Sequence, residues 1–459
     1  YGANIPEADE EIIHYLDEKI SALENKASTK HVYFPNGLDQ APVRKNLPEL
    51  VKKFNRLNSE REYIIDSPEN FMAEIEKDCQ NLPIIHGELT EGKNSRIHKS
   101  IFSSRADLKQ ANNKIENFIV NILEPVLSIS YSLGNRYPHE ELAEIWKLMF
   151  ANAAHDSIGA CNSDSTNRDI ASRYKIAQDM SENLLDLNMR LISRKTDHNS
   201  DFSFNIFNPL PYERKCVTEF TAYIPEDDFR IFDLDGKELK YVIKEKTELT
   251  DYVLSQHIYL NPSKKAYMPE KVYKAKILVE TGSVPAMGYT QFYIDMAKKE
   301  KQKVEKEYQI NEIENEFYHI TFEANNTLTI KDKKSDKIYR NQMIFEENGD
   351  DGDSYNYSPP RKDMVIRSSD LQNTKSEGTK VYKSDVENVL KLQLNMKVPK
   401  DLESRSKGIN NENFRLNIEV SLRKNDDLVR FSVKADNQVL SHRLCVCFDT
   451  EIAGKFSTA

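Results

Sequence analysis

"SDSTNRDIASRYKIAQDMSENLLDLNMRLISRK" (residues 163–195) carries apolar side chains at the spacing of a long amphipathic helix. The expected stripe consists of Ile170, Tyr174, Ala177, Met180, Leu184, Leu187 and Leu191. Two runs before it, residues 104–133 and 138–160, show the same periodicity, the first through Leu108, Ile115, Ile119, Ile122 and Leu123. Three long helices joined by short connectors predict an antiparallel three-helix bundle over residues 101–198.

Residues 1–100, before this bundle, alternate helix and strand signals. Helical patterns cover residues 7–23, 46–57 and 67–79, the last two opened by the capping residues Asn46 and Ser67; strand-like runs cover residues 31–37 and 62–66. Such alternation predicts an α/β layer with a parallel sheet. Two or three strands are too few for a sheet covered on both faces, so we expect residues 1–100 to be the C-terminal part of a domain that begins before Tyr1.

From Phe202 onward the pattern becomes β. Alternating strands cut by turn residues predict a small β-sandwich domain over residues 199–300. A charged linker over residues 298–307 then leads into a larger β-sandwich over residues 301–459, which includes a hairpin turn at Asn325-Asn326. The fold class is therefore multidomain: an α/β remnant, an α-helical bundle and β-sandwiches. The last strand-like run ends without an obvious stop, so we expect the large sandwich to be incomplete.

Composition limits the class of protein. The chain has 459 residues, enough for about three or four domains, and a net charge of -10, which argues against nucleic acid or an anionic membrane as the main partner. No apolar run approaches the roughly 20 residues of a membrane span. The cysteines are odd in number and lack zinc-finger spacing: Cys79, Cys161, Cys216, Cys445 and Cys447. They are typical of buried free thiols in a reducing compartment, which predicts a cytoplasmic location.

The polar pair His155-Asp156 interrupts an apolar helical run in "NAAHDSIGACNSD" (residues 152–164). Inside a helix, such a pair is costly to bury unless both side chains are paired or bound. One interpretation is a helix C-terminus, where a protonated His favours the helix dipole and Asp is solvated. The other is half of a site, with His155 on the same helix face as Leu148 and the small Ala151, turned toward a neighbouring domain.

Several stretches, in this order, resemble the retaining α-mannosidases of glycoside hydrolase family 38, bacterial branch. They are "IFSSRADLKQANN" (101–113), "HDSIGAC" (155–161), "FNIFNPLPYER" (204–214), "NEFYHITFEANNTLTIKDKKSDKIYRN" (315–341) and "DGDSYNYSPP" (351–360). The resemblance implies a hydrolase that uses one Zn²⁺ per active site, held by a His-x-Asp pair, an Asp that is also the nucleophile, and the His of the His-Asp motif. That last ligand corresponds to His155. The sequence holds no suitable His-x-Asp pair, so we expect the nucleophile and the other ligands before Tyr1.

The resemblance also suggests roles for four other residues. Asp156 would bind sugar hydroxyls. Asp39, in "NGLDQAP" at the end of an expected strand, would be the acid/base or a hydroxyl contact, with an ordinary turn Asp as the alternative. Tyr355 would place its phenol against the sugar, with a rim tyrosine between two β layers as the alternative. We expect Asp39 within about 12 Å of His155, the span of one small-ligand pocket, with Tyr355 approaching the same cleft. Arg105 more simply ties the bundle to the α/β domain through a carboxylate.

The expected function is therefore hydrolysis of terminal α-linked mannose by a zinc-dependent retaining α-mannosidase, with this chain inactive by itself. Retaining hydrolysis needs two carboxylates about 5–5.5 Å apart, one nucleophile and one acid/base. The expected partner is a mannose-containing oligosaccharide or mannoside, with no nucleic acid and no membrane, and association into a homo-oligomer stays open. The competing class is a non-catalytic carbohydrate-binding or scaffolding protein built from a bundle and β-sandwiches.

Overall fold

The computed structural model describes residues 5–454 except residues 7, 36, 38–41, 80–83, 85, 87–100, 102–103, 198–199, 201, 226–227, 261–269, 297–305 and 354–356, and only the backbone of residues 256–260. The chain divides into two compact units, residues 1–89 with 454–459, and residues 90–453. Each unit is described by itself below. None of the helices in the described part combines the length and the apolar character that a bilayer span requires.

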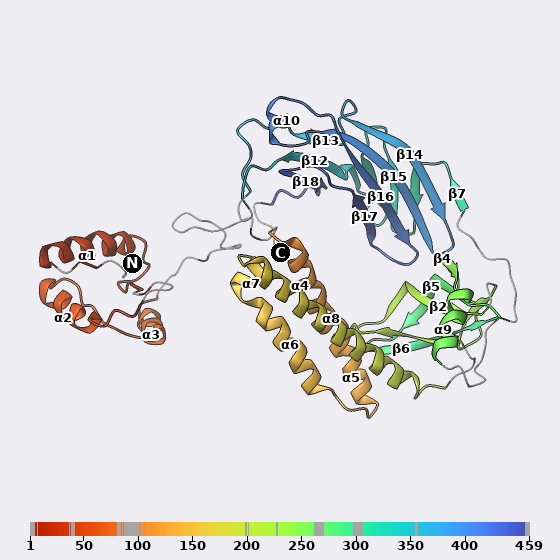
Figure 1. The fold of residues 1–459 in the computed structure, drawn as a ribbon, viewed down its shortest axis with the longest axis horizontal. Helices are drawn as coiled ribbons and strands as arrows, with labels where there is room; N and C mark the ends of the chain where they lie inside the picture. The colour runs from red at the N-terminus through yellow and green to blue at the C-terminus, as the bar shows by residue number, and fades with distance from the viewer. Residues whose placement is uncertain are drawn as a thin grey trace. The chain divides into compact units, whose positions relative to one another are not determined.

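The first unit contains the helices α1 (Asp9–Glu24), α2 (Leu47–Leu57) and α3 (Pro68–Asp78) (Figure 1). Its core is formed by α1 and α2, and its buried side chains are Ile5, Ile12, Leu16, Ile20, Leu50 and Phe54. Ser67 caps α3 as expected, since its hydroxyl accepts a hydrogen bond from the Asn70 N–H at 3.3 Å. Asn46 holds the N-cap position of α2 but makes no capping bond through its side chain. The three expected helices are therefore present.

The two strands expected in this unit are not formed among its described residues. Residues 31–35 and 62–66 carry no strand assignment. The backbone of Tyr63 bonds instead to one side chain: the Asn55 amide accepts from the Tyr63 N–H at 2.7 Å and donates to the Tyr63 carbonyl at 2.9 Å. A side-chain amide thus takes the hydrogen bonds that a neighbouring strand would have made.

The second unit opens with helices that share one apolar core. They are α4 (Ala106–Phe118), a π-helical turn η2 (Ile119–Leu123), α5 (Glu124–Ser132), α6 (His139–Ala153), α7 (His155–Gly159) and α8 (Asp164–Ser193) (Figure 1). Leu108, Ile115, Ile119 and Leu123 are buried as expected, whereas Ile122 is exposed. The π-helical turn ends two residues before Pro125, which lacks an N–H and cannot donate to a helical carbonyl. Because a π-helical turn is wider than an α-helical turn, Ile122 and Leu123 do not both face the core.

The buried stripe of α8 differs from the expected one after its midpoint. Ile170, Tyr174 and Ala177 are buried, and Met180 and Leu184 are half-buried against the same core, as expected. The next buried positions are Ser181, Asn188 and Ile192, while Leu187 is 53 % exposed. Ser181 and Asn188 satisfy their own polar atoms by donating to the carbonyls four residues earlier, at 2.7 and 2.9 Å. Small polar residues that bond within the helix can therefore occupy core positions of α8.

The small β domain consists of two antiparallel three-stranded sheets. One has the order β1-β6-β3 and the other β2-β5-β4. Their strands are β1 (Ser203–Asn208), β2 (Arg214–Ile224), β3 (Arg230–Asp233), β4 (Tyr241–Glu248), β5 (Tyr273–Val284) and β6 (Gly288–Asp295). Side chains from both sheets form one core that includes Phe229, Ile277 and Phe292. The helix α9 (Thr250–Leu260) was not expected from the sequence.

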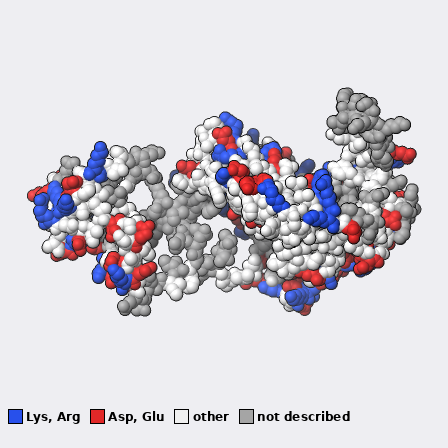
Figure 2. All heavy atoms as spheres, turned by 90° about the horizontal axis from the view of Figure 1, so that it is seen from below, with Lys and Arg blue, Asp and Glu red and all other residues white. Residues whose placement is uncertain are grey.

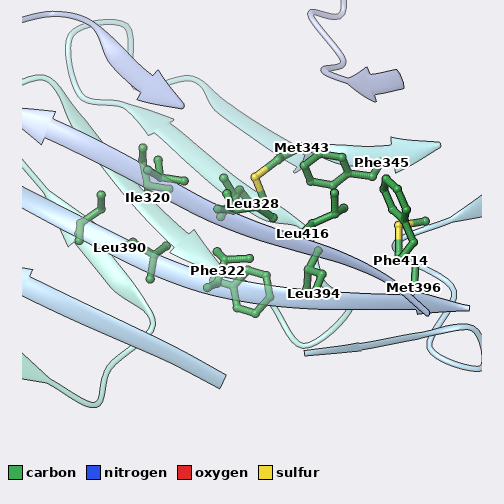
Figure 3. Close-up of a cluster of buried hydrophobic side chains, with 14 of the residues drawn as sticks. Ile320, Phe322, Leu328, Met343, Phe345, Leu390, Leu394, Met396, Phe414 and Leu416 are labelled. Atoms are coloured by element: carbon green, nitrogen blue, oxygen red, sulfur yellow. The ribbon is translucent and has the colours of Figure 1, made fainter. Parts of the chain in front are cut away.

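The large β domain contains sheets of five, four and three antiparallel strands, ordered β17-β16-β15-β14-β7, β11-β10-β9-β8 and β13-β12-β18. Its elements are β7 (Lys306–Tyr308), β8 (Glu312–Glu314), β9 (Tyr318–Phe322), β10 (Leu328–Asp332), β11 (Ile338–Gln342), β12 (Ile344–Gly349), β13 (Ile366–Arg367), β14 (Thr374–Lys383), β15 (Glu387–Val398), α10 (Leu402–Ser406), β16 (Glu412–Arg423), β17 (Val429–Ala435) and β18 (His442–Cys447). Alternate residues of β15 and β16, such as Leu394 and Leu416, point into the core (Figure 3).

Two local expectations in this domain have clear outcomes. The turn at Asn325-Asn326 joins the antiparallel strands β9 and β10, with Asn326 left-handed at a φ of 61°, so the predicted hairpin is confirmed. The end of the expected linker over residues 298–307 forms strand β7, which pairs with β14. The linker boundary was therefore set too late, because its charged residues suit the edge of a sheet as well as a solvated connector.

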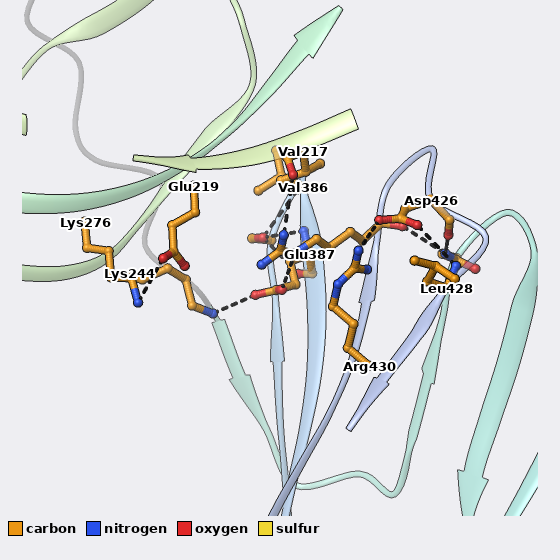
Figure 4. A network of polar contacts seen from close by, with 12 residues as sticks. Val217, Glu219, Lys244, Lys276, Val386, Glu387, Asp426, Leu428 and Arg430 are labelled. Atoms are coloured by element: carbon orange, nitrogen blue, oxygen red, sulfur yellow. Dashed lines mark hydrogen bonds and ion pairs between the residues drawn. The ribbon is translucent and has the colours of Figure 1, made fainter. Parts of the chain in front are cut away.

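Ion pairs connect the two β domains. Glu387 is 6 % exposed and binds Lys244 of β4 at 2.8 Å and Arg423 of β16 at 3.1 Å (Figure 4). Lys424 binds Glu280 of β5 at 3.2 Å. A small apolar cluster at the same junction includes Val217 and Val386. This polar and apolar contact couples the two β domains.

Candidate functional site

His155 lies immediately after a break between two helices. α6 ends at Ala153, and Ala154 has an extended backbone with a ψ of 136°, so α7 starts a new helix at His155. The expected continuous helix over residues 138–160 is therefore wrong at this point. The helix face that would have joined Leu148 and Ala151 to His155 is also not formed, because the break changes the helical register.

The His155 and Asp156 side chains point into solvent within their unit. The imidazole is 97 % exposed and the carboxylate 67 % exposed, with 3.4 Å between His155 Nε2 and Asp156 Oδ1. The premise of a buried polar pair is therefore wrong. The apolar core of the helices does not cover the pair either, so the ring nitrogens of His155 remain accessible to a ligand.

A buried amide holds the end of α6 directly before this break. Asn152 is fully buried, and its amide donates to the Ile170 carbonyl of α8 at 3.0 Å and accepts from Arg173 Nε at 2.6 Å. These two bonds fix α6 against α8 three residues before His155. The sequence reading missed Asn152, although an Asn in an apolar helical run is a recognisable signal for a satisfied core amide.

The residues after Asp156 close α7 tightly. The Asp156 carbonyl accepts from the Cys161 N–H at 3.1 Å and from the Asn162 amide at 2.7 Å. The left-handed residue of this turn is Ala160, with a φ of 66°, rather than Gly159. Gly159 is buried, and a Cβ added there would lie 3.2 Å from Ile101 Cδ1. The glycine therefore allows close packing against Ile101.

Charged residues at the start of α4 form a local network. Arg105 binds Asp107 through two bonds of 3.0 and 2.8 Å, which lowers the pKa of the Asp107 carboxyl. Lys109 donates to the Ser104 carbonyl, and burial of its ammonium lowers the Lys109 pKa. The expected structural role of Arg105 thus has a different partner: the carboxylate lies two residues away on the same helix.

Asp39 and Tyr355 lie outside the described residues, so their expected approach to His155 stays a prediction. The base of the loop that carries Tyr355 is described. Asp350 Oδ1 accepts from the Gly352 N–H at 2.9 Å and from the Ser358 N–H at 3.2 Å. Its carboxylate organises this turn, as an Asp in a loop often does.

A buried charged cluster holds both ends of this loop. Glu347 is fully buried and binds the guanidinium of Arg405, which also binds Asp363 at 3.3 Å. Asp363 accepts in turn from the Gly349 N–H at 3.0 Å. His442 Nδ1 lies 3.3 Å from the Glu347 carboxylate. No sequence signal singled out these residues, because they come from four separate segments.

The described residues contain no complete metal centre. No three His, Cys, Asp or Glu side chains gather in a metal-binding arrangement in the part of the chain that the structure describes. The exposed His155 imidazole suits a single zinc bond, and zinc sites in proteins need at least three such ligands. The described residues therefore suit the supply of one zinc ligand, His155, and not of a whole zinc site.

The cysteine prediction holds in part. All five cysteines are free thiols, as expected. Cys161 and Cys447 are exposed and the other three are half-buried, so the expectation that the thiols are buried is wrong. Cys445 and Cys447 lie two residues apart on β18, at one edge of the sheet ordered β13-β12-β18. On the face shown in Figure 2, Lys and Arg are interspersed with Asp and Glu.

Comparisons with known proteins match most of the chain. The alpha mannosidase middle domain model matches residues 96–192, and the glycosyl hydrolases family 38 C-terminal domain model matches residues 313–459. A protein of Halalkalibacterium halodurans with the provisional name mannosylglycerate hydrolase is 24 % identical over 98 % of the chain. The chain spans 54 % of that relative, about half of its length.

Two solved structures share the fold. An alpha-mannosidase from Enterococcus faecalis V583 superposes with a TM-score of 0.76 at 24 % identity, covering 98 % of this chain and 55 % of that one. A glycosyl hydrolase family 38 protein from Enterococcus faecalis superposes with a TM-score of 0.70 at 24 % identity, covering 97 % and 55 %. The two family models together cover more than half of the residues. The chain therefore belongs to glycosyl hydrolase family 38.

Proposed function

We propose that the protein acts as a zinc-dependent retaining α-mannosidase, with His155 as one zinc ligand. The observation that carries the proposal is the 97 % exposed imidazole of His155, held on a helix break inside the matched middle domain. The helices around it would form the three-helix bundle that presents the motif. The remaining ligands and the nucleophile would come from residues outside the described part.

The described residues would support this chemistry by positioning. A bound zinc would orient the sugar by polarising its hydroxyl oxygens. Asp156, 67 % exposed beside His155, would accept hydrogen bonds from sugar hydroxyls. The Asn152 amide would keep the His155 segment fixed against α8. Asp39 would act as acid/base or hydroxyl contact, and Tyr355 would pack against the sugar ring.

The proposed substrates are terminal α-mannosides. The provisional name of the Halalkalibacterium halodurans relative supports small mannosides, mannosylglycerate among them, beside mannose-containing oligosaccharides. The five free thiols support a reducing compartment such as the cytoplasm. The chain by itself, with one zinc ligand in its described part, is expected to leave aryl α-mannosides intact.

The test uses the whole protein that contains this chain. His155→Ala should lower zinc content, measured by mass spectrometry, together with hydrolysis of an aryl α-mannoside, because one metal bond is lost. Asp156→Asn should keep the zinc and lower kcat by about tenfold or more, as expected for a lost charged hydrogen bond. His139→Ala is the matched control, since His139 is another exposed histidine, at the first residue of α6.

Full zinc occupancy in His155→Ala would overturn the ligand assignment. A whole protein that binds mannosides without hydrolysing them, whatever its zinc content, would support the competing non-catalytic carbohydrate-binding function. The two readouts separate these outcomes because metal content is measured independently of turnover.

A further inference from the structure

The solvent-facing side of the five-stranded sheet contains a hollow remote in sequence from the His155 segment. Its volume is about 490 Å³, within the range of about 300–1,000 Å³ typical of small-molecule sites. Its lining comes from β14, β15, β16 and β17, together with Gln309 next to β7. The opposite side of the same strands forms the apolar core in Figure 3, so the hollow lies on a rigid support.

Strand register arranges the polar side chains of the hollow in two rows. Gln393 of β15 lies opposite Asn417 of β16, which lies opposite Lys434 of β17. In the next row, Lys391 lies opposite Glu419, which lies opposite Ser432. Paired residues on one sheet face have Cβ atoms about 4.5–5.5 Å apart. The rows therefore present amide, ammonium, carboxylate and hydroxyl groups within reach of one small ligand.

A β-bulge shapes one side of the hollow. The pairing of β14 with β15 shifts between Ser376 and Thr379, and Gly378 between them has a φ of +96°. A Cβ at Gly378 would meet no atom within 4 Å, so this part of the rim is open. Bulges commonly re-aim side chains beside binding sites. Here the bulge brings Glu377 into the lining.

Most charged groups of the lining already have a partner, in an ion pair or a hydrogen bond. Lys391 binds Glu419 at 2.6 Å, Lys380 binds Glu307 at 3.2 Å, and Glu377 accepts from the Asn395 amide at 2.6 Å. The two carboxylates and three ammonium groups of the lining leave only a small net charge, so the wall has no strong attraction for a polyanion such as a phosphate group. Vicinal hydroxyls suit such a wall, because each hydroxyl both donates and accepts hydrogen bonds.

One buried group in the hollow lacks a partner. The side-chain nitrogen of Gln393 is covered from solvent, and it has no hydrogen-bond partner among the described residues. An unsatisfied buried donor is destabilising, so its presence in a core-backed strand needs an explanation. A hydroxyl oxygen entering the hollow would supply the missing acceptor after a small rotation of the Gln393 amide.

We propose that this hollow is a saccharide-binding site, separate from the His155 segment, with Gln393 and Asn417 as its main hydrogen-bonding residues. Lys434, for which no ion pair is found within the described ranges, donates to a further sugar oxygen. The site binds sugar without reacting with it. It holds a glycan on the large β domain, whatever the activity of the His155 segment.

The experiment measures sugar binding to the whole chain by saturation-transfer difference NMR and calorimetry. The probes are methyl α-mannoside, an α-mannobiose, maltose and inorganic phosphate. Gln393→Leu should weaken saccharide binding about tenfold, the effect expected for one buried hydrogen bond. The melting temperature should stay the same or rise, because the substitution removes an unsatisfied donor. Asn417→Ala should weaken binding similarly.

Two controls make the result specific. Lys397→Ala changes an exposed residue of the same strand outside the lining and should leave binding unchanged. Maltose is the second control, because it carries no mannose and the proposed hydrolytic site is not expected to hold it, so its binding reports on the hollow alone. The proposal is overturned if none of the sugars binds, if Gln393→Leu binds them as tightly as the unchanged chain, or if phosphate displaces them.

Discussion

The Asn152 amide joins α6 to α8 at the point where the chain turns toward His155. Its carbonyl oxygen and its nitrogen both have partners on α8, at 2.6 and 3.0 Å. Asn152→Leu would keep the size of the side chain and remove both bonds. We expect the free energy of unfolding to fall by about 1–3 kcal/mol, the cost of leaving buried polar partners unsatisfied.

Urea denaturation followed by circular dichroism measures this change. Asn121→Leu is the matched control, because Asn121 is exposed and its amide donates to the side chain of the nearby Asn117 at 3.0 Å. Its effect should stay within about 0.5 kcal/mol, as for most surface substitutions. Equal effects of the two substitutions would show that Asn152 does not anchor the helices.

Part of the candidate site could be predicted from individual residues in the sequence. The His-Asp pair stood out because charged residues in an apolar helical run need an explanation. The break at Ala154 did not stand out, because alanine is the strongest helix former and no proline or glycine marks the position. The contacts of Asn152 with α8 depend on residues about twenty positions away, and local patterns do not contain that information.

The spacing of buried residues along α8 differs from a seven-residue repeat. Positions 170, 181 and 192 are fully buried and lie eleven residues apart, which corresponds to 3.67 residues per turn. The expected stripe followed leucines at a shorter spacing and therefore drifted off the core face by Leu187. The prediction followed the leucines, whereas the small polar residues Ser181 and Asn188 lie on the buried face of α8.

Two alanine substitutions distinguish these spacings. Ile192→Ala should lower the free energy of unfolding by about 2–4 kcal/mol, because Ile192 packs with Val126 and Ile129 and is fully buried. Leu187→Ala should cost less than about 0.5 kcal/mol, since its side chain is 53 % exposed. Chemical denaturation measures both, and a larger loss at Leu187 would contradict the eleven-residue spacing.

The strands were easier to predict than their sheets. Alternation of apolar and polar residues predicted the β character of residues 199–300 and 301–459, because that pattern follows from one buried and one solvated face. The same pattern at residues 31–35 and 62–66 did not produce strands in the described structure. A strand exists only with a hydrogen-bonded neighbour, and no local pattern supplies that neighbour.

The two β domains should unfold together, because Glu387 of the large domain joins them. Its carboxylate is nearly buried and binds Lys244 and Arg423. Removing one member of a buried charged group is strongly destabilising, since the others lose their compensation. We expect Glu387→Ala to lower the unfolding temperature of the large domain and to split one calorimetric transition into two.

Differential scanning calorimetry at a single scan rate tests this coupling. Glu219→Ala is the matched control, because Glu219 forms an exposed pair with Lys276 within the small β domain (Figure 4). Exposed pairs contribute little, so this variant should unfold like the unchanged chain. A single unshifted transition in Glu387→Ala would mean that the apolar cluster of Val217 and Val386, with the Lys424–Glu280 pair, couples the domains without Glu387.

The length of α8 sets how far apart its two ends lie and how they are rotated relative to each other about the helix axis. Its 30 residues make a rod of about 45 Å, which starts beside α7 and ends where Ser193 Oγ accepts from the Asn205 amide of β1 at 2.8 Å. One inserted residue would turn the His155 end by about 100° about the helix axis. Eleven inserted residues would restore the original facing and lengthen the rod by about 16 Å. Insertions that keep the facing of this segment must therefore add close to a whole number of helical turns, such as about seven or eleven residues.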